Sequence, residues 1–184
     1  ELLPSIIGVW LAGAAYVPLD PTVPAARRAR IVDAARLDAV VADDDVSAWC
    51  PARPILLADV GHDVHEPAPV APDDPAYVIF TSGSTGVPAG VVVTHGNLAA
   101  STAARRKVYG AAPPERFLLT SSIGFDSSMV GLYWPLATGG TVLLAGDEEI
   151  HDVDRLAGLI ETHAATHLLM VPTLYQALLD RHHS

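Results

Sequence analysis

Residues 81–90 read TSGSTGVPAG and lie between two short apolar runs, AYVIF at 76–80 and VVVT at 91–94. Both runs are rich in β-branched or aromatic residues, which predicts two strands joined by this loop. The first six residues of the loop are two glycines and four hydroxyl side chains. Glycines let backbone N–H groups turn inward and hydroxyls add donors, so this composition is typical of an anion-binding nest. We therefore predict a phosphate-binding loop rather than a surface turn.

Two common loop chemistries do not fit residues 81–90. A Walker loop needs Gly-Lys-Ser/Thr at a fixed spacing, and no such triplet follows here. A hydrolase elbow needs Gly-x-Ser-x-Gly, which is also absent. A hydrolase triad can still be composed from Ser84, His95 and Asp126, but the missing elbow makes this the weaker hypothesis.

Short apolar runs alternate with segments of helical periodicity along the chain. The expected strands are 38–42, 54–58, 76–80, 91–94, 117–120, 141–145 and 167–171. The expected helices are 1–12, 24–37, 97–109, 127–136, 153–163 and 172–181. This alternation predicts an α/β fold with a mostly parallel sheet flanked by helices. Residues 61–75 are polar and proline-rich, and we expect them to link two sublobes, 1–60 and 76–184.

Composition excludes several classes of protein. The chain has 184 residues, half of them apolar, with 11 Lys plus Arg against 21 Asp plus Glu and a net charge of −10. Such a chain is not disordered, and its acidic balance argues against a nucleic-acid partner. The apolar run at 6–19 is shorter than the ~20 residues of a membrane span, so we expect no membrane partner and a cytoplasmic protein. The single cysteine, Cys50, excludes an intrachain disulfide, and we expect it to be structural.

Four ordered segments carry a family resemblance. They are 11–21 (LAGAAYVPLDP), 77–91 (YVIFTSGSTGVPAGV), 94–98 (THGNL) and 125–128 (FDSS). Together they resemble the N-terminal core of the adenylation domains of non-ribosomal peptide synthetases, in the adenylate-forming, AMP-binding superfamily. The resemblance covers nearly the whole chain, which would make residues 1–184 a partial adenylation domain.

The resemblance implies a reaction and its participants. A complete family enzyme uses ATP and Mg²⁺ to convert an amino acid to an aminoacyl-adenylate. It then loads the aminoacyl group on the phosphopantetheine of a carrier protein, beside condensation domains of the synthetase. Asp126 would pair with the α-ammonium group of the substrate. The phosphate-binding residues implied are Thr81, Ser82, Gly83, Ser84, Thr85 and Gly86. The substrate-binding residues implied are Asp126, Ser127, Val130, Met170 and His95.

Two departures from the family pattern bear on activity. The family has lysine at the position of Ala89, and alanine removes a positive charge from the triphosphate site. In addition, no segment resembles the downstream core or the C-terminal lobe that delivers the catalytic lysine, so no catalytic residue is assigned. We therefore predict that this chain alone is inactive. Two hypotheses stay open: a part of an amino-acid-activating enzyme, or a truncated pseudo-adenylation domain that acts as a scaffold between synthetase domains.

Other polar clusters have simpler interpretations. His62, Asp63, His65 and Glu66 could suggest a metal site, but a proline-rich loop gives ligands no rigid scaffold, so no metal site is predicted. Residues 105–107 (RRK) fall late in an expected helix, where cations suit the helix dipole. Asp152 and Asp154 fit the start of the next helix. His95 either approaches the acyl substrate or caps the helix that follows it.

Overall fold

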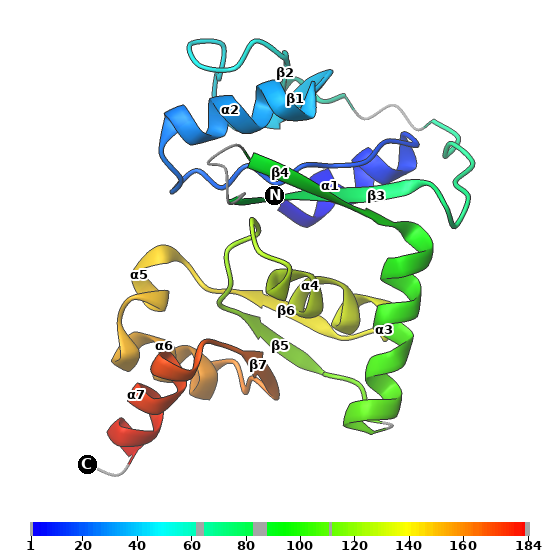
Figure 1. Ribbon diagram of the computed structural model, residues 1–184. Helices are drawn as coiled ribbons and strands as arrows, with labels where there is room; N and C mark the ends of the chain where they lie inside the picture. Colours follow the sequence, from blue (N-terminus) through cyan, green and yellow to red (C-terminus); the bar gives the residue numbers. More distant parts are fainter. Residues whose placement is uncertain (1, 62–64, 83–87, 111, 183–184) are drawn as a thin grey trace. The chain divides into compact units, whose positions relative to one another are not determined.

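Figure 1 shows a computed structural model of the chain, which describes residues 2–61, 65–82, 88–110 and 112–182. The chain forms two compact units, Glu1–Leu98 and Ala99–Ser184, and each has its own strands and helices. The fold is α/β, as the alternating pattern predicted.

The first unit contains two helices, a 3-10 turn and two separate pairs of strands. Its elements are α1 (Leu2–Leu11), α2 (Ala25–Ala35), β1 (Ala39–Ala42), β2 (Arg53–Leu56), η1 (Leu57–Asp59), β3 (Pro75–Ser82) and β4 (Pro88–Thr94). Strands β1 and β2 are parallel, whereas β3 and β4 are antiparallel. The antiparallel pair departs from the expected parallel pattern because residues 83–87 are too few for the crossover that parallel neighbours need.

Residues 61–75 do not divide the two units. The Ala68 N–H donates to the Leu11 carbonyl at 2.8 Å, and the Val78 N–H donates to the Tyr16 carbonyl at 2.9 Å. At Gly13, where φ is +73°, an added Cβ would lie 2.9 Å from the Ala68 Cβ. These contacts hold β3 and the segment before it to the N-terminal residues. The division therefore falls at 98/99 and differs from the expected sublobes 1–60 and 76–184.

The second unit contains the predicted parallel sheet. Helix α3 (His95–Tyr109) begins in the first unit and continues into the second. The other elements are β5 (Arg116–Leu119), α4 (Ser127–Ala137), β6 (Thr141–Leu144), α5 (Asp147–Ile150), α6 (Val153–Thr162), β7 (His167–Leu169) and α7 (Pro172–His182). The sheet order is β6-β5-β7, and both pairings are parallel. The short helix α5 contains the acidic residues Asp147, Glu148 and Glu149.

Helix α6 begins where its acidic residues predicted. Asp152 is the N-cap, and its carboxylate accepts hydrogen bonds from the backbone N–H groups of Asp154 and Arg155. Asp154 adds an ion pair with Arg181 of α7 at 2.5 Å. The expected role of Asp152 at the start of this helix is confirmed.

A glycine sets the distance between α4 and the sheet. A Cβ added at Gly131 would lie 2.8 Å from the Phe117 ring and 2.9 Å from a Leu119 methyl group. We expect Gly131→Ala to lower the free energy of unfolding by about 1–3 kcal/mol, because overpacking forces side chains or backbone to shift.

Gly158 in α6 is the matched control for Gly131. An added Cβ there meets no atom within 4 Å. We expect Gly158→Ala to raise the free energy of unfolding by about 0.5–1 kcal/mol, since alanine favours a helix interior. Urea denaturation of both variants measures the difference, and equal effects would contradict the close packing at Gly131.

Candidate functional site

Strands β3 and β4 are longer than predicted, and their pairing includes both ends of the predicted phosphate loop, residues 81–82 and 88–90. Thr81 is opposite Ala89, and Ser82 is opposite Pro88. The Thr81 hydroxyl donates to the Ala89 carbonyl at 3.4 Å. Four of the predicted phosphate ligands lie outside the described residues: Gly83, Ser84, Thr85 and Gly86. Thr81 and Ser82 end β3 directly before them.

Ala89 occupies an exposed position on β4. Opposite residues on paired strands share one face, so a longer side chain at this position would lie beside Thr81. One residue later, an added Cβ at Gly90 would be 3.0 Å from both the Phe80 ring and a Val78 methyl group. Gly90 therefore gives the Phe80 ring room against β4 at the base of the loop.

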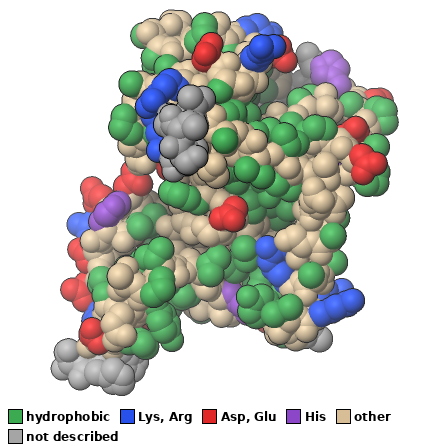
Figure 2. Space-filling model, in the orientation of Figure 1, with side chains coloured by type: hydrophobic (Ala, Val, Ile, Leu, Met, Phe, Trp, Pro, Cys, Tyr) green, Lys and Arg blue, Asp and Glu red, His purple; other side chains and the backbone are tan. Residues whose placement is uncertain are grey.

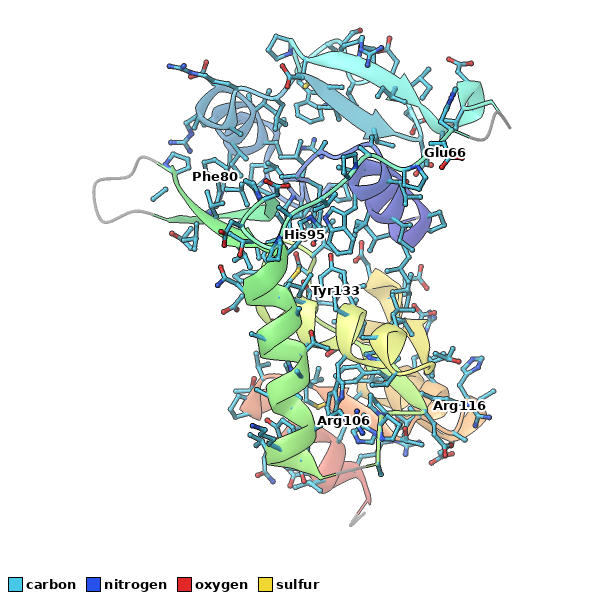
Figure 3. The ribbon with its side chains drawn as sticks, turned by 90° about the vertical axis from the view of Figure 1, so that its right-hand side faces the viewer. Glu66, Phe80, His95, Arg106, Arg116 and Tyr133 are labelled. Atoms are coloured by element: carbon cyan, nitrogen blue, oxygen red, sulfur yellow. The ribbon has the colours of Figure 1, made fainter. Side chains whose placement is uncertain are left out.

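The helix after β4 is capped by Thr94 and Asn97. The Thr94 N–H donates to the Asn97 side-chain oxygen at 3.2 Å, and the Asn97 N–H donates to the Thr94 hydroxyl at 3.1 Å. This is the reciprocal pattern of a capping box. His95, labelled at the start of α3 in Figure 3, instead lies edge-on to Trp10. Their ring centroids are 5.3 Å apart. The capping role suggested for the His95 side chain therefore belongs to its neighbours, and a contact with substrate stays a prediction.

The predicted substrate residues of the second unit follow the carboxyl ends of two adjacent strands. Asp126, Ser127 and Val130 come after β5, and Met170 comes directly after β7. Since β5 and β7 are parallel neighbours, their carboxyl ends meet at one edge of the sheet. Ligands of parallel α/β sheets bind outside this edge. The topology therefore places these four residues in the two chain segments that follow the carboxyl ends of β5 and β7.

Asp126 lies at the start of α4 with its side chain exposed. Its carboxylate makes no capping hydrogen bond to the helix. Val130 is four residues later, so it shares a helix face with Asp126. Ser127, Val130 and Met170 are half-buried. A carboxylate beside partly buried apolar side chains can bind an ammonium group whose carbon substituent is apolar.

Two hydroxyls that sequence reasoning missed support this segment. Ser128 is fully buried, and its hydroxyl donates to the Phe125 carbonyl at 2.7 Å. Thr120 is 9% exposed, and its hydroxyl donates to the Leu169 carbonyl at 2.9 Å. Thr120 falls at the end of the expected strand 117–120, and this position alone gave no functional signal. The sequence alone did not identify its partner, which is 49 positions away.

Within residues 2–61, 65–82, 88–110 and 112–182, no three His, Cys, Asp or Glu side chains are grouped to hold a metal ion. His62 and Asp63 lie outside those ranges. Arg106 and Lys107 are in the last turn of α3, as expected. Among the described helices, none has the length and apolar character needed to cross a membrane.

Comparison with known proteins identifies the family. A profile described as "AMP-binding enzyme" matches residues 1–184. The chain belongs to this family. Within the AMP-binding enzymes it matches the N-terminal portion of the adenylation domains of nonribosomal peptide synthetases, so the sequence resemblance is confirmed.

Two curated relatives are similar along nearly all of the chain. A dimodular nonribosomal peptide synthase of Bacillus subtilis is 34% identical over 190 residues, which cover 97% of this chain and 8% of that protein. The pyochelin synthetase PchF of Pseudomonas aeruginosa is 37% identical over 182 residues, which cover 97% of this chain and 10% of that protein. The chain therefore spans a tenth or less of the length of either relative.

Crystal structures of the nonribosomal peptide synthetase FmoA3 share the fold. The form bound to AMPPNP has a TM-score of 0.84 and 30% identity, and the match covers 99% of this chain and 20% of FmoA3. The form bound to α-methyl-L-serine-AMP has a TM-score of 0.86 and 29% identity, with 100% and 21% covered.

Proposed function

We propose that this chain is part of an adenylation domain that, in its complete form, activates an amino acid with ATP. An oxygen of the amino-acid carboxylate attacks the α-phosphorus, the bond from this phosphorus to the bridging oxygen breaks, and pyrophosphate leaves. The carrier thiol then attacks the acyl carbonyl and AMP leaves, with the thiol proton passing to a base. The observation that carries this proposal is the Asp126 carboxylate, which is exposed and makes no capping hydrogen bond to α4. It follows the carboxyl end of a strand of the parallel sheet in a chain of this family.

The candidate residues of each unit would have a separate role. In the second unit, Asp126 would bind the α-ammonium group, and Ser127, Val130 and Met170 would contact the amino-acid side chain. In the first unit, Thr81 and Ser82 would begin the triphosphate loop, and His95 is a further candidate for the acyl group. The structures of FmoA3 bound to AMPPNP and to an aminoacyl-AMP support the use of ATP.

Mg²⁺ and a phosphopantetheine carrier remain part of the proposal for the complete protein. Mg²⁺ would be bound through the phosphates of ATP, because the described residues provide no cluster of metal ligands of their own. Carrier and condensation domains are proposed as partners because the relatives are multidomain synthetases.

The activity is tested by amino-acid-dependent exchange of pyrophosphate into ATP. We expect exchange with one or a few members of an amino-acid panel in a complete protein that contains this chain, and none from the 184-residue chain. Absence of exchange in the complete protein, with intact folding by circular dichroism, would contradict the enzymatic proposal. The pseudo-adenylation alternative would then be favoured by its one specific observation, Ala89 in place of a lysine.

Ala89→Lys tests the missing positive charge at the loop. A charge-assisted contact contributes about 1.5–3 kcal/mol, so we expect affinity for ATP–Mg²⁺ to rise about 10- to 100-fold. Isothermal titration into the 184-residue chain measures this directly. Val92→Lys is the matched control, because Val92 is exposed on the same strand but farther from the loop. Equal gains in both variants would indicate nonspecific attraction rather than a triphosphate site.

A further inference from the structure

Two threonines hold the opposite ends of the β5–β7 pair. Backbone pairing of these strands runs from Phe117 opposite His167 to Leu119 opposite Leu169. At the amino end, the Thr166 hydroxyl donates to the Arg116 carbonyl at 3.1 Å. At the carboxyl end, the Thr120 hydroxyl donates to the Leu169 carbonyl at 2.9 Å. At the amino end the hydroxyl bond adds to a backbone bond from the Thr166 N–H to the same Arg116 carbonyl, whereas at the carboxyl end a hydroxyl bond extends the ladder beyond the last paired residues.

The bond at the carboxyl end joins the two segments that carry the candidate substrate residues. Leu169 is the residue before Met170, and Thr120 begins the segment that leads to Asp126. Thr120 is 9% exposed, so its bond is protected from competition with water. The segment ends in a second fixed point, because the buried Ser128 hydroxyl bonds the Phe125 carbonyl at 2.7 Å. Asp126 lies between Phe125 and Ser128, the two residues of that bond.

We propose that Thr120 is a positioning residue that holds the Asp126 segment against the end of β7, so that Asp126 and Met170 contact the same substrate molecule. The inference rests on the proposed function for the substrate, but the hydrogen bond itself does not. Thr120 lies at the strand end and acts through Leu169 and the segment 121–128. Loss of the Thr120 hydroxyl removes its hydrogen bond to the Leu169 carbonyl, next to Met170. The start of the segment 121–128 is then held less firmly.

Three variants test the proposal in two readouts. Thr120→Val removes the hydroxyl with little change in shape, Thr120→Ser keeps it, and Thr166→Val removes the corresponding hydroxyl at the far end of the strand pair. In the 184-residue chain, amide hydrogen exchange is followed by mass spectrometry. We expect Thr120→Val to speed exchange in 121–128 by about 2- to 12-fold, the change that corresponds to one hydrogen bond. Thr120→Ser should restore the original rate, and Thr166→Val should leave 121–128 unchanged.

The second readout is the pyrophosphate exchange of the complete protein, with the amino acid that supports it in the unmodified protein. We expect Thr120→Val to raise the KM for the amino acid by about 2- to 12-fold with little change in the KM for ATP. Thr166→Val should leave both values unchanged.

The two readouts separate the failure of the inference from the failure of the proposed function. If the complete protein has no activity, the hydrogen-exchange result still decides whether Thr120 holds the segment. Unchanged exchange in Thr120→Val, or an equal increase in 121–128 for Thr166→Val, would overturn the proposal. An equal rise of both KM values in Thr120→Val would also overturn it, because that result describes general loosening of the fold.

Discussion

Asp126→Asn lowers kcat/KM for the amino acid at least about 100-fold in a complete protein that contains this chain. Breaking a desolvated ion pair costs about 3–5 kcal/mol, and the amide that replaces the carboxylate leaves the substrate ammonium unpaired. Because the Asp126 carboxylate does not cap α4, its replacement should leave the stability of the helix nearly unchanged. The measurement is pyrophosphate exchange at several concentrations of amino acid.

A substrate without the ammonium group makes this test specific. The carboxylic acid that lacks only the α-amino group should lose little kcat/KM in Asp126→Asn, so the preference for the amino acid over this analogue should fall. The control variant is Asp147→Asn, which removes a carboxylate from the exposed start of α5. An equal loss for both substrates would contradict the pairing of Asp126 with the ammonium group.

Leu132→Ala lowers the free energy of unfolding by about 2–5 kcal/mol, through lost transfer free energy and the cavity that remains. Leu132 lies in α4 and its side chain is fully buried. Since a domain is stable by only about 5–15 kcal/mol, this change removes a large part of the stability.

Leu136 is the matched control for Leu132, because it lies one turn later on α4 and is 40% exposed. We expect Leu136→Ala to have a much smaller effect, as a half-solvated side chain leaves no closed cavity. Urea denaturation followed by far-ultraviolet circular dichroism measures both. Similar costs for the two variants would contradict the difference in burial between Leu132 and Leu136.

Local sequence patterns predicted the helices and strands better than the contacts between them. β-Branched runs identify strands such as 117–120 because burial and backbone preference act within a few residues. The antiparallel pairing of β3 with β4, and the hydrogen bond of Ala68 with Leu11, depend on contacts between distant residues. Those contacts follow from the folded chain and not from local preference.

Residues of the candidate site can be predicted from sequence only where the residue type has a characteristic binding chemistry. A carboxylate after a strand, at Asp126, suggests recognition of a cation, and hydroxyls with glycines suggest recognition of phosphate. The threonine at position 120 suggested nothing, because its significance comes from the Leu169 carbonyl. A side chain whose partner is a distant backbone atom has no sequence signature.

Some large hydrophobic side chains of the second unit are exposed. Val171, Tyr175 and Leu179 are spaced four residues apart at the end of β7 and along α7, and all three are exposed. In Figure 2, hydrophobic side chains gather on the face where Figure 1 places α6 and α7. Arg181 ties α7 to α6 through Asp154, so this row lies outside the contact that anchors the helix.

The buried Cys50 makes the first unit separately observable. Its thiol lies in a cluster with Val32, Val40 and Ala52, and it is 3% exposed. Because the second unit has no cysteine, the rate of reaction with a thiol reagent reports only the opening of the first unit. Comparing that rate with hydrogen exchange at Leu118 in the second unit would show whether the two halves of the chain unfold together. The reactivity of a single thiol thus measures the opening rate of one unit without contribution from the other.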